Sequence, residues 1–209
     1  LPGKSVQIFT PFHVQLPEVF SRIGHGKNGT YQVTQWYPKP AVYDRAGWHP
    51  MPYLDQGEFY SEFGNYDLYL TLPADYVVAS TGTLQDSLEI KWLKQKNQSL
   101  NKEPNKKHTG VQKTLHYRAD SVHDVGWFAS RRFLVDADTC RLPDGKTLDV
   151  WHFYPPERVK SWKQSLTYSK QGLRYYSSRI GAYPYQTISV VETAEGPGGG
   201  MEYPMLSVI

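Results

Sequence analysis

The chain has 209 residues, 39% of them apolar, and a formal net charge of +3 with acidic and basic residues interspersed. That length suits one large domain, or one domain with part of a second. The mixed charges lack the basic stripe that nucleic acid demands, so we expect no nucleic-acid partner. No apolar run approaches the ~20 residues of a membrane-spanning helix, and a single cysteine excludes an internal disulfide.

Up to about residue 154 the apolar residues follow a period of two, which is typical of strands. Turn residues such as Thr81-Gly82 and Pro143-Asp144-Gly145 separate the runs. Many short strands with regular turns predict a mainly β, antiparallel sandwich or barrel-like sheet. We interpret the polar stretch 94–110 as a hairpin excursion. The predicted strand runs are Tyr31–Tyr37, Asp67–Leu72, Ser87–Leu93, Lys113–Arg118, Arg132–Val135 and Thr147–Tyr154.

At Pro155 the pattern changes to that of a helix. Pro155-Pro156-Glu157 places prolines and an acid at a helix start. The spacing that follows predicts one long helix to about Arg179, ended by Gly181. A strand at 187–192 and a glycine run come next, so an α/β unit begins near Pro155. The predicted apolar face of the helix comprises Val159, Trp162, Leu166, Leu173, Tyr176 and Ile180.

The seven histidines offer no metal site within the chain. None has another histidine three or four residues away, and no His-Glu-x-x-His spacing occurs. We interpret His123-Asp124 as a surface turn. Cys140 precedes a Pro-Asp-Gly turn and is interpreted as an inert loop cysteine.

Aromatic residues concentrate between Trp36 and Tyr60, together with Asp44 and Asp55. One interpretation is a platform for a sugar or a protein partner, and the other is packing within a β-sandwich. On the residues alone, the packing interpretation is favoured and the platform stays open.

The segment Gly198-Gly199-Gly200-Met201-Glu202-Tyr203-Pro204 places one carboxylate just after a glycine run. Because glycine has no Cβ, another backbone can approach it closely. One interpretation is an ordinary turn leading into a strand. The other is an edge strand that pairs with an extended peptide, with Glu202 neutralising the terminal amine of that peptide.

Gly199-Gly200-Met201-Glu202-Tyr203 resembles the Gly-x-Met-Glu-Asn exopeptidase motif of the aminopeptidase N-like zinc metallopeptidases. The resemblance continues in order along nearly the whole chain and points to the bacterial branch of that family. Its other segments are 35–44 (Gln-Trp-Tyr-Pro-Lys-Pro-Ala-Val-Tyr-Asp), 57–64 (Gly-Glu-Phe-Tyr-Ser-Glu-Phe-Gly), 77–82 (Val-Val-Ala-Ser-Thr-Gly), 122–130 (Val-His-Asp-Val-Gly-Trp-Phe-Ala-Ser) and 181–185 (Gly-Ala-Tyr-Pro-Tyr).

The resemblance implies a saddle-like N-terminal β domain at residues 1–150 and the truncated start of an α/β thermolysin-like catalytic domain at 151–209. Glu202 would bind the free α-amino group of a peptide substrate, and Gly199, Gly200 and Met201 would pair with its backbone. Tyr203 stands where the family usually has Asn.

The resemblance also implies Zn²⁺ in the full-length enzyme, held by a His-Glu-x-x-His helix and a distant Glu beyond Ile209. We therefore expect no catalytic residue, no metal ligand and no bound zinc in this chain, which would be inactive without the rest of its catalytic domain. The chain begins at Leu1 rather than Met, and we favour an exported bacterial protein over a cytoplasmic one. The alternative function is a non-catalytic β-sandwich module that binds a glycan or a protein partner.

Overall fold

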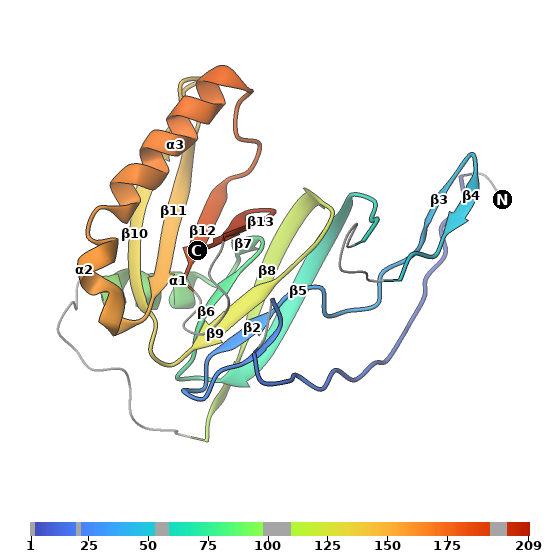
Figure 1. The fold of residues 1–209 in the computed structure, drawn as a ribbon, viewed down its shortest axis with the longest axis horizontal. Coiled ribbons are helices and arrows are strands. Elements are labelled where there is room, and N and C mark those ends of the chain that lie inside the picture. Colours follow the sequence, from blue (N-terminus) through green and yellow to red (C-terminus); the bar gives the residue numbers. More distant parts are fainter. Residues whose placement is uncertain (1–2, 20–21, 53–58, 98–109, 193–199) are drawn as a thin grey trace.

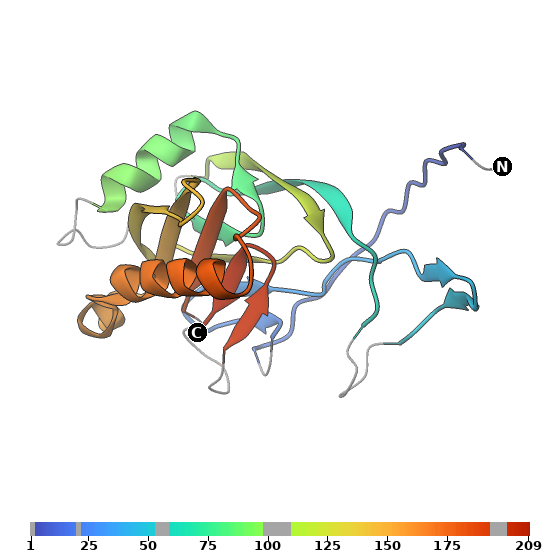
Figure 2. The same ribbon diagram turned by 90° about the horizontal axis from the view of Figure 1, so that it is seen from above.

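The computed structural model describes residues 3–19, 22–52, 59–97, 110–192 and 200–209. Three sheets and helix α3 lie in successive layers, and a small hairpin projects from them (Figures 1 and 2). The mainly β, antiparallel architecture expected from the sequence is confirmed. The first layer is the sheet β5-β8-β7, formed by Gly64–Pro73, Gln112–Val122 and Thr83–Leu84. The projecting hairpin consists of β3 (Val42–Asp44) and β4 (Gly47–His49).

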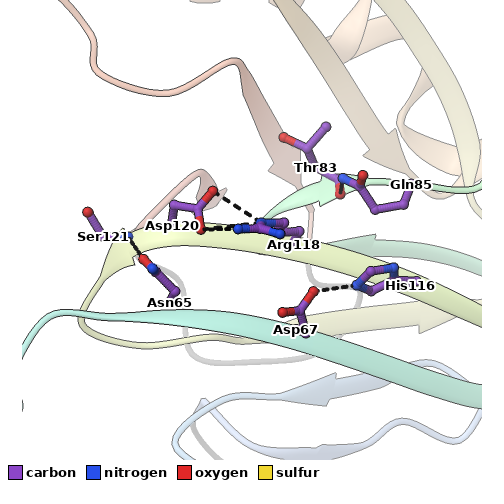
Figure 3. Close-up of polar contacts among 8 residues, drawn as sticks. All are labelled: Asn65, Asp67, Thr83, Gln85, His116, Arg118, Asp120 and Ser121. Atoms are coloured by element: carbon purple, nitrogen blue, oxygen red, sulfur yellow. Dashed lines mark hydrogen bonds and ion pairs between the residues drawn. The ribbon is translucent and has the colours of Figure 1, made fainter.

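The outer face of the first sheet is polar, as its alternating sequence predicts. The His116 ring contacts the Asp67 carboxylate at 2.6 Å and stacks on Tyr69 with ring centroids 4.3 Å apart. Arg118 pairs with Asp120 on the same strand (Figure 3). The inner face carries Leu70, Leu115 and Tyr117, which pack on the second layer. Because its charged groups already pair with one another, we regard this outer face as a solvated sheet surface.

The second layer is the sheet β1-β2-β9-β6, and it is covered on both faces. Val78 and Ala129 face the first sheet, whereas Val77, Ala79 and Phe128 face the third. Side chains alternate between the faces of a strand, so a strand between two layers reads as a continuous apolar run. The strands are Gly24–His25, Tyr31–Val33, Trp127–Ser130 and Val77–Ser80.

The third layer is the five-stranded sheet β10-β11-β12-β14-β13. Strands β11 and β12 pair in parallel, as do β12 and β14, and the other pairs are antiparallel. One face of β11 contributes Phe153 to the core shared with the second layer, and the opposite face contributes Val150 to the contact with α3. The strands are Leu134–Arg141, Thr147–Tyr154, Thr187–Val191, Leu206–Val208 and Met201–Tyr203. The expected division between residues 150 and 151 falls inside β11.

The prediction of a strand at Ser87–Leu93 is wrong, because this segment begins helix α1 (Ser87–Asn97). The Asp86 carboxylate accepts hydrogen bonds from the backbone N–H groups of Leu88 and Glu89, at 2.9 and 3.0 Å. That is the bonding of a helix N-cap. The alternation that suggested a strand is not a pattern of burial, since Leu88 is 78% exposed while Leu93 is buried.

The prediction of one long helix after Pro155 is also wrong. A 3-10 turn (η1, Pro156–Arg158) leads into α2 (Val159–Trp162), and α3 (Ser165–Arg179) follows as a separate helix. At the break the Ser165 hydroxyl donates to the Trp162 carbonyl at 2.6 Å. Trp162 turns inward and stacks on Tyr154, with ring centroids 4.8 Å apart.

The predicted apolar face of this helical region is only partly buried. Leu166 and Leu173 pack on the sheet as expected, but Tyr176 and Ile180 near the end of α3 are 60% and 81% exposed. The contacts of α3 with the sheet are mainly with β10 and β11. The end of α3 at Arg179 agrees with the sequence prediction.

Candidate functional site

Strand β13 is the last strand of the five-stranded sheet and follows the glycine run directly in sequence. In the part of the chain that the structure describes, β13 pairs on one side only, with β14. Its register places Met201 opposite Val208, Glu202 opposite Ser207 and Tyr203 opposite Leu206. No described strand lies on its other side, and an extended peptide can add to a sheet at such a position.

A tight turn joins β13 to β14 and fixes the position of the edge. Pro204 and Met205 form the turn, and Met205 takes φ of +60°, which is uncommon for a residue with a Cβ. The Met205 side chain is buried against Val122 and Val125, and its carbonyl accepts a hydrogen bond from the Ser189 N–H at 2.9 Å. Core packing thus holds the turn in this conformation.

The Glu202 side chain is exposed and lines an open hollow of about 560 Å³. Within the described residues, no hydrogen bond or ion pair of its carboxylate is present, so the charge is available to a ligand. The remaining lining residues are Met51, Phe59, Tyr60, Ser61, His123, Met201 and Tyr203. One anionic group at a largely aromatic hollow is suited to a ligand with one cationic and one apolar part.

Residues far apart in the sequence form the wall opposite β13. The pairing of β5 with β8 sets Gly64 opposite Val122, which brings the residues before β5 next to the residue after β8. As a result His123 stacks on Phe59 at 6.2 Å and meets the Phe63 ring edge-on at 5.5 Å between centroids.

A buried ion pair lies behind this wall. The Lys39 ammonium is 2.7 Å from Asp124 Oδ1, and the Asp124 side chain is 1% exposed. The same oxygen accepts hydrogen bonds from the Val125 N–H at 2.8 Å and the Tyr37 hydroxyl at 3.2 Å. Burial, and then hydrogen bonding, raises the pKa of the Tyr37 hydroxyl well above its usual range, so it stays a donor. Lys39 also lies 3.7 Å from the centre of the Phe59 ring.

The structure brings together three of the five residues predicted to bind substrate. Met201, Glu202 and Tyr203 all line the hollow. Gly200 precedes the strand, and a Cβ there would lie 3.2 Å from the Val208 carbonyl oxygen, so its neighbouring backbone is that of β14. Gly199 lies outside the described residues. The binding roles of all five residues stay predictions.

Sequence reasoning missed Lys39, Phe59, His123 and Asp124. The interpretation of His123-Asp124 as a surface turn is wrong, because Asp124 is fully buried and His123 lines the hollow. Adjacent ionisable residues directly after an alternating strand were the available signal. The aromatic region from Trp36 to Tyr60 contains both buried and exposed rings. Trp36 packs on Trp127, while Tyr43 and Trp48 are exposed on the β3–β4 hairpin.

Neither a metal cluster nor a membrane helix is found in the described ranges. No group of three or more His, Cys, Asp or Glu side chains there is placed to hold a metal ion. The described residues therefore do not fit a zinc ion. None of the described helices combines the length and apolar composition that crossing a bilayer requires.

A scan against protein-family models found no match, and a search of curated proteins found none. Several solved structures share the fold. A mutant M1 zinc metallopeptidase from Deinococcus radiodurans aligns with a TM-score of 0.57 and 15% identity, over 92% of this chain and 39% of that chain. A second structure from D. radiodurans gives 0.51 and 15%, over 70% and 30%. Aminopeptidase A from Legionella pneumophila, in complex with aspartic acid, gives 0.50 and 12%, over 70% and 16%.

These identities establish the fold alone. The chain has the mainly β architecture that M1 zinc metallopeptidases show over the aligned region. It spans between 16% and 39% of the length of those proteins.

Proposed function

We propose that this chain is the N-terminal portion of a zinc-dependent aminopeptidase that removes N-terminal residues from peptides. In this proposal residues 1–150 form the N-terminal β domain and residues 151–209 begin the catalytic domain. The observation that carries the proposal is the exposed Glu202 carboxylate at an aromatic hollow, on a strand that pairs with β14 alone within the described residues. The fold shared with M1 zinc metallopeptidases supports it.

The chemistry of the edge suits recognition of a peptide N-terminus. An extended peptide adds to an open strand through main-chain hydrogen bonds, which do not depend on its sequence. Its terminal ammonium would then pair with Glu202, and a charge-assisted contact is stronger than one between neutral groups. Since an interior residue of a peptide carries no ammonium, Glu202 would restrict binding to free N-termini. The residue acts in binding and orientation, not in bond cleavage.

The metal-dependent step is assigned to no residue of this chain. Zinc bound in the full-length enzyme would supply a Lewis acid and an activated water. Its ligands would come from the rest of the catalytic domain, which this proposal makes the partner of the chain.

Replacement of Glu202 in the full-length enzyme tests the proposal. Glu202→Ala should lower kcat/KM for peptides with a free amine by tens- to thousands-fold, because loss of one member of a desolvated charge pair costs ~2–5 kcal/mol and a decade in rate is ~1.4 kcal/mol. Glu202→Gln should cost less, since it retains an acceptor. Any activity on N-acetylated peptides should hardly change.

Glu62→Ala is the matched control, because Glu62 is an exposed carboxylate next to Ser61 that does not line the hollow. It should leave both substrate classes unaffected. Equal losses on free and acetylated peptides in Glu202→Ala would show a structural role, and the amine-binding assignment would then be abandoned.

A further inference from the structure

The charges of the chain are mixed overall, but one segment is an exception. Residues 158–191 contain six of the 23 basic residues and none of the 20 acidic residues. The rest of the chain carries 17 basic and 20 acidic residues, so the net positive charge of the protein comes from this segment alone. The segment includes helices α2 and α3. A protein with this distribution of charge presents its helical side to an anionic partner.

Helix α3 forms an outer edge of the molecule in two perpendicular views (Figures 1 and 2). It packs on the sheet through Leu166 and Leu173, and its opposite face is exposed. Tyr168 and Tyr175, here called the outer tyrosines, are 61% and 59% exposed. Because they are seven residues apart, with Arg179 four residues further on, the three side chains form one row along the exposed face. The Arg179 guanidinium lies 5.8 Å from the centre of the Tyr175 ring.

Three of the six cations lie at the two ends of α3 and are not neutralised. Lys160 and Lys163 precede the helix and Arg179 ends it, and we call these three residues the basic group. All three are exposed, and none forms an ion pair within the part of the chain that the structure describes. The other cations have acceptors in the fold, which are Glu192 for Arg158, Asp138 for Lys170 and the Arg141 carbonyl for Arg174.

The C-terminal end of α3 adds an apolar contribution next to this charge. Ile180 is 81% exposed and Tyr176 is 60% exposed. A tyrosine has an apolar ring and a polar hydroxyl, so it suits the boundary between water and lipid. The exposed side of α3 therefore combines uncompensated cations, tyrosine rings and one aliphatic side chain.

We infer that the exposed side of α3 binds the surface of an anionic phospholipid bilayer, with the basic group at the headgroups and the outer tyrosines and Ile180 in the interface. The inference is independent of the proposed function, because none of these residues lines the hollow at Glu202.

The size of the surface favours a bilayer over a protein partner. With 15 residues, α3 is about 22 Å long and roughly 10 Å wide, so its exposed face covers about 200 Å². A stable protein complex buries about 800 Å² on each partner. Binding to an anionic bilayer requires no complementary shape, and each basic residue near the surface strengthens it by about fivefold.

The first experiment measures co-sedimentation with lipid vesicles, using the full-length protein and, beside it, the 209-residue chain. Both should bind vesicles of phosphatidylcholine with about one-third phosphatidylglycerol, and neither should bind phosphatidylcholine alone. Binding should weaken towards about 1 M salt, where charges are screened beyond ~3 Å. The triple variant Lys160→Gln/Lys163→Gln/Arg179→Gln should weaken binding by about a hundredfold, because three basic residues are lost.

A matched variant controls for net charge. Lys4→Gln/Arg45→Gln/Lys91→Gln removes the same number of exposed cations from other parts of the fold. It should weaken binding by less than about threefold, since these residues lie outside the acid-free segment and contribute only through the field of the whole protein. An equal loss in both triple variants would overturn the inference, because binding would then follow net charge alone.

The second experiment locates the contact. Cys140 is buried, so a cysteine introduced on the surface can be labelled selectively with a dye that reports polarity. We compare Ile180→Cys with Tyr43→Cys, since both positions are exposed and position 43 lies on the β3–β4 hairpin. The dye at position 180 should shift to shorter wavelength on anionic vesicles, and the dye at position 43 should not. The reverse result would assign binding to another face.

Two further results would assign α3 to a different partner and so overturn the inference. One is tighter binding to duplex DNA or to polyglutamate than to the anionic vesicles. The other is vesicle binding by the 209-residue chain but not by the full-length protein, which would show that the remainder of the protein covers α3. Glu202→Ala should leave vesicle binding unchanged, so failure of the proposed function is distinguishable from failure of this inference.

Discussion

At the scale of single residues, Gly82 is under a tight backbone constraint. It turns the chain from β6 to β7 with φ of +98°, and a Cβ there would lie 2.8 Å from the Arg118 carbonyl oxygen. Both the dihedral angle and the close approach exclude a larger residue. The strand pairing of β7 with β8 therefore depends on this glycine.

We predict that Gly82→Ala lowers the free energy of unfolding by about 2–4 kcal/mol, through dihedral strain and the clash together. Gly145→Ala is the control, because Gly145 has φ of +90° but nothing within 4 Å of its Cβ position. In that variant the free energy of unfolding should fall only by the ~1–3 kcal/mol that dihedral strain costs. Urea denaturation measures both, and equal losses would show that the approach to Arg118 is not limiting.

His152 provides a second test at the scale of one residue. Its ring is buried between β11 and α3, where its nitrogens lie 2.8 Å and 3.0 Å from the Ser165 and Ser169 hydroxyls. Burial lowers the pKa of His152 from 6.5 to about 4. The folded protein thus keeps the ring neutral at a pH where the unfolded chain protonates it.

Stability should therefore fall as the pH drops from about 6.5 towards 4. Above pH 6.5 the neutral ring contributes its full share to the free energy of unfolding. At pH 4 the loss of that free energy approaches ~3 kcal/mol, at ~1.4 kcal/mol per pKa unit. In His152→Gln this part of the pH dependence should disappear. Urea unfolding at several pH values compares the two proteins, and parallel curves would refute the assignment.

At the scale of elements, helix α1 illustrates how a capping residue outweighs a strand-like pattern. Asp86 satisfies two N–H groups of the first turn, and Leu93 buries the helix against the core between two sheets. Asp86→Ala should lower the free energy of unfolding by about 1 kcal/mol, whereas Asp86→Asn should lose little, because Asn also accepts these bonds. Loss of helical circular dichroism at a lower urea concentration is the measurement. No difference between the two variants would mean that packing alone holds α1.

Elements with a clean alternation could be predicted from the sequence. The Asp67–Leu72 run lies within β5, and the Thr147–Tyr154 run coincides with β11. The alternation of apolar residues failed to predict elements whose structure depends on local side-chain hydrogen bonds. The Asp86 cap begins a helix where the alternation predicted a strand, and the hydrogen bond of Ser165 lies at the break between α2 and α3.

The candidate site likewise has one part that the sequence predicts and one part that it does not. Glu202 is recognisable because its motif is contiguous. The wall is not, because Phe59 and His123 meet through the long-range pairing of β5 with β8, and Lys39 lies against them through its ion pair with Asp124. No pattern within a short window of sequence carries that register.

For the whole molecule, the shared core governs how the chain unfolds. Val77 and Phe128 of the second layer, Leu93 of α1, and Val191 and Leu206 of the third layer belong to one buried cluster. Residues on both sides of position 150 thus stabilise one another. We predict a single cooperative transition, with amides of β12 exchanging as slowly as those of β6 and β9. Faster exchange confined to residues 155–192 would show separate unfolding.

A second prediction for the whole chain concerns metal. After a chelator wash, the 209-residue protein should retain no stoichiometric zinc, because none of its seven histidines has a partner at ligand spacing. Elemental analysis measures this directly. One tightly held zinc per chain would require a ligand set that neither the sequence spacing nor the described residues contain.

Among the described residues β13 pairs with β14 alone, and this position at the end of the sheet has a consequence for solubility. An unpaired strand edge is a template for any extended chain, including a second copy of the same edge, and proteins limit this with short strands and charged side chains. Strand β13 has three residues, and the central one is Glu202. The carboxylate that would attract an ammonium also repels its own copy on another molecule. Removing it to test binding would therefore make the protein more prone to aggregate. Under the proposed function, selection for solubility and selection for binding would act on the same side chain.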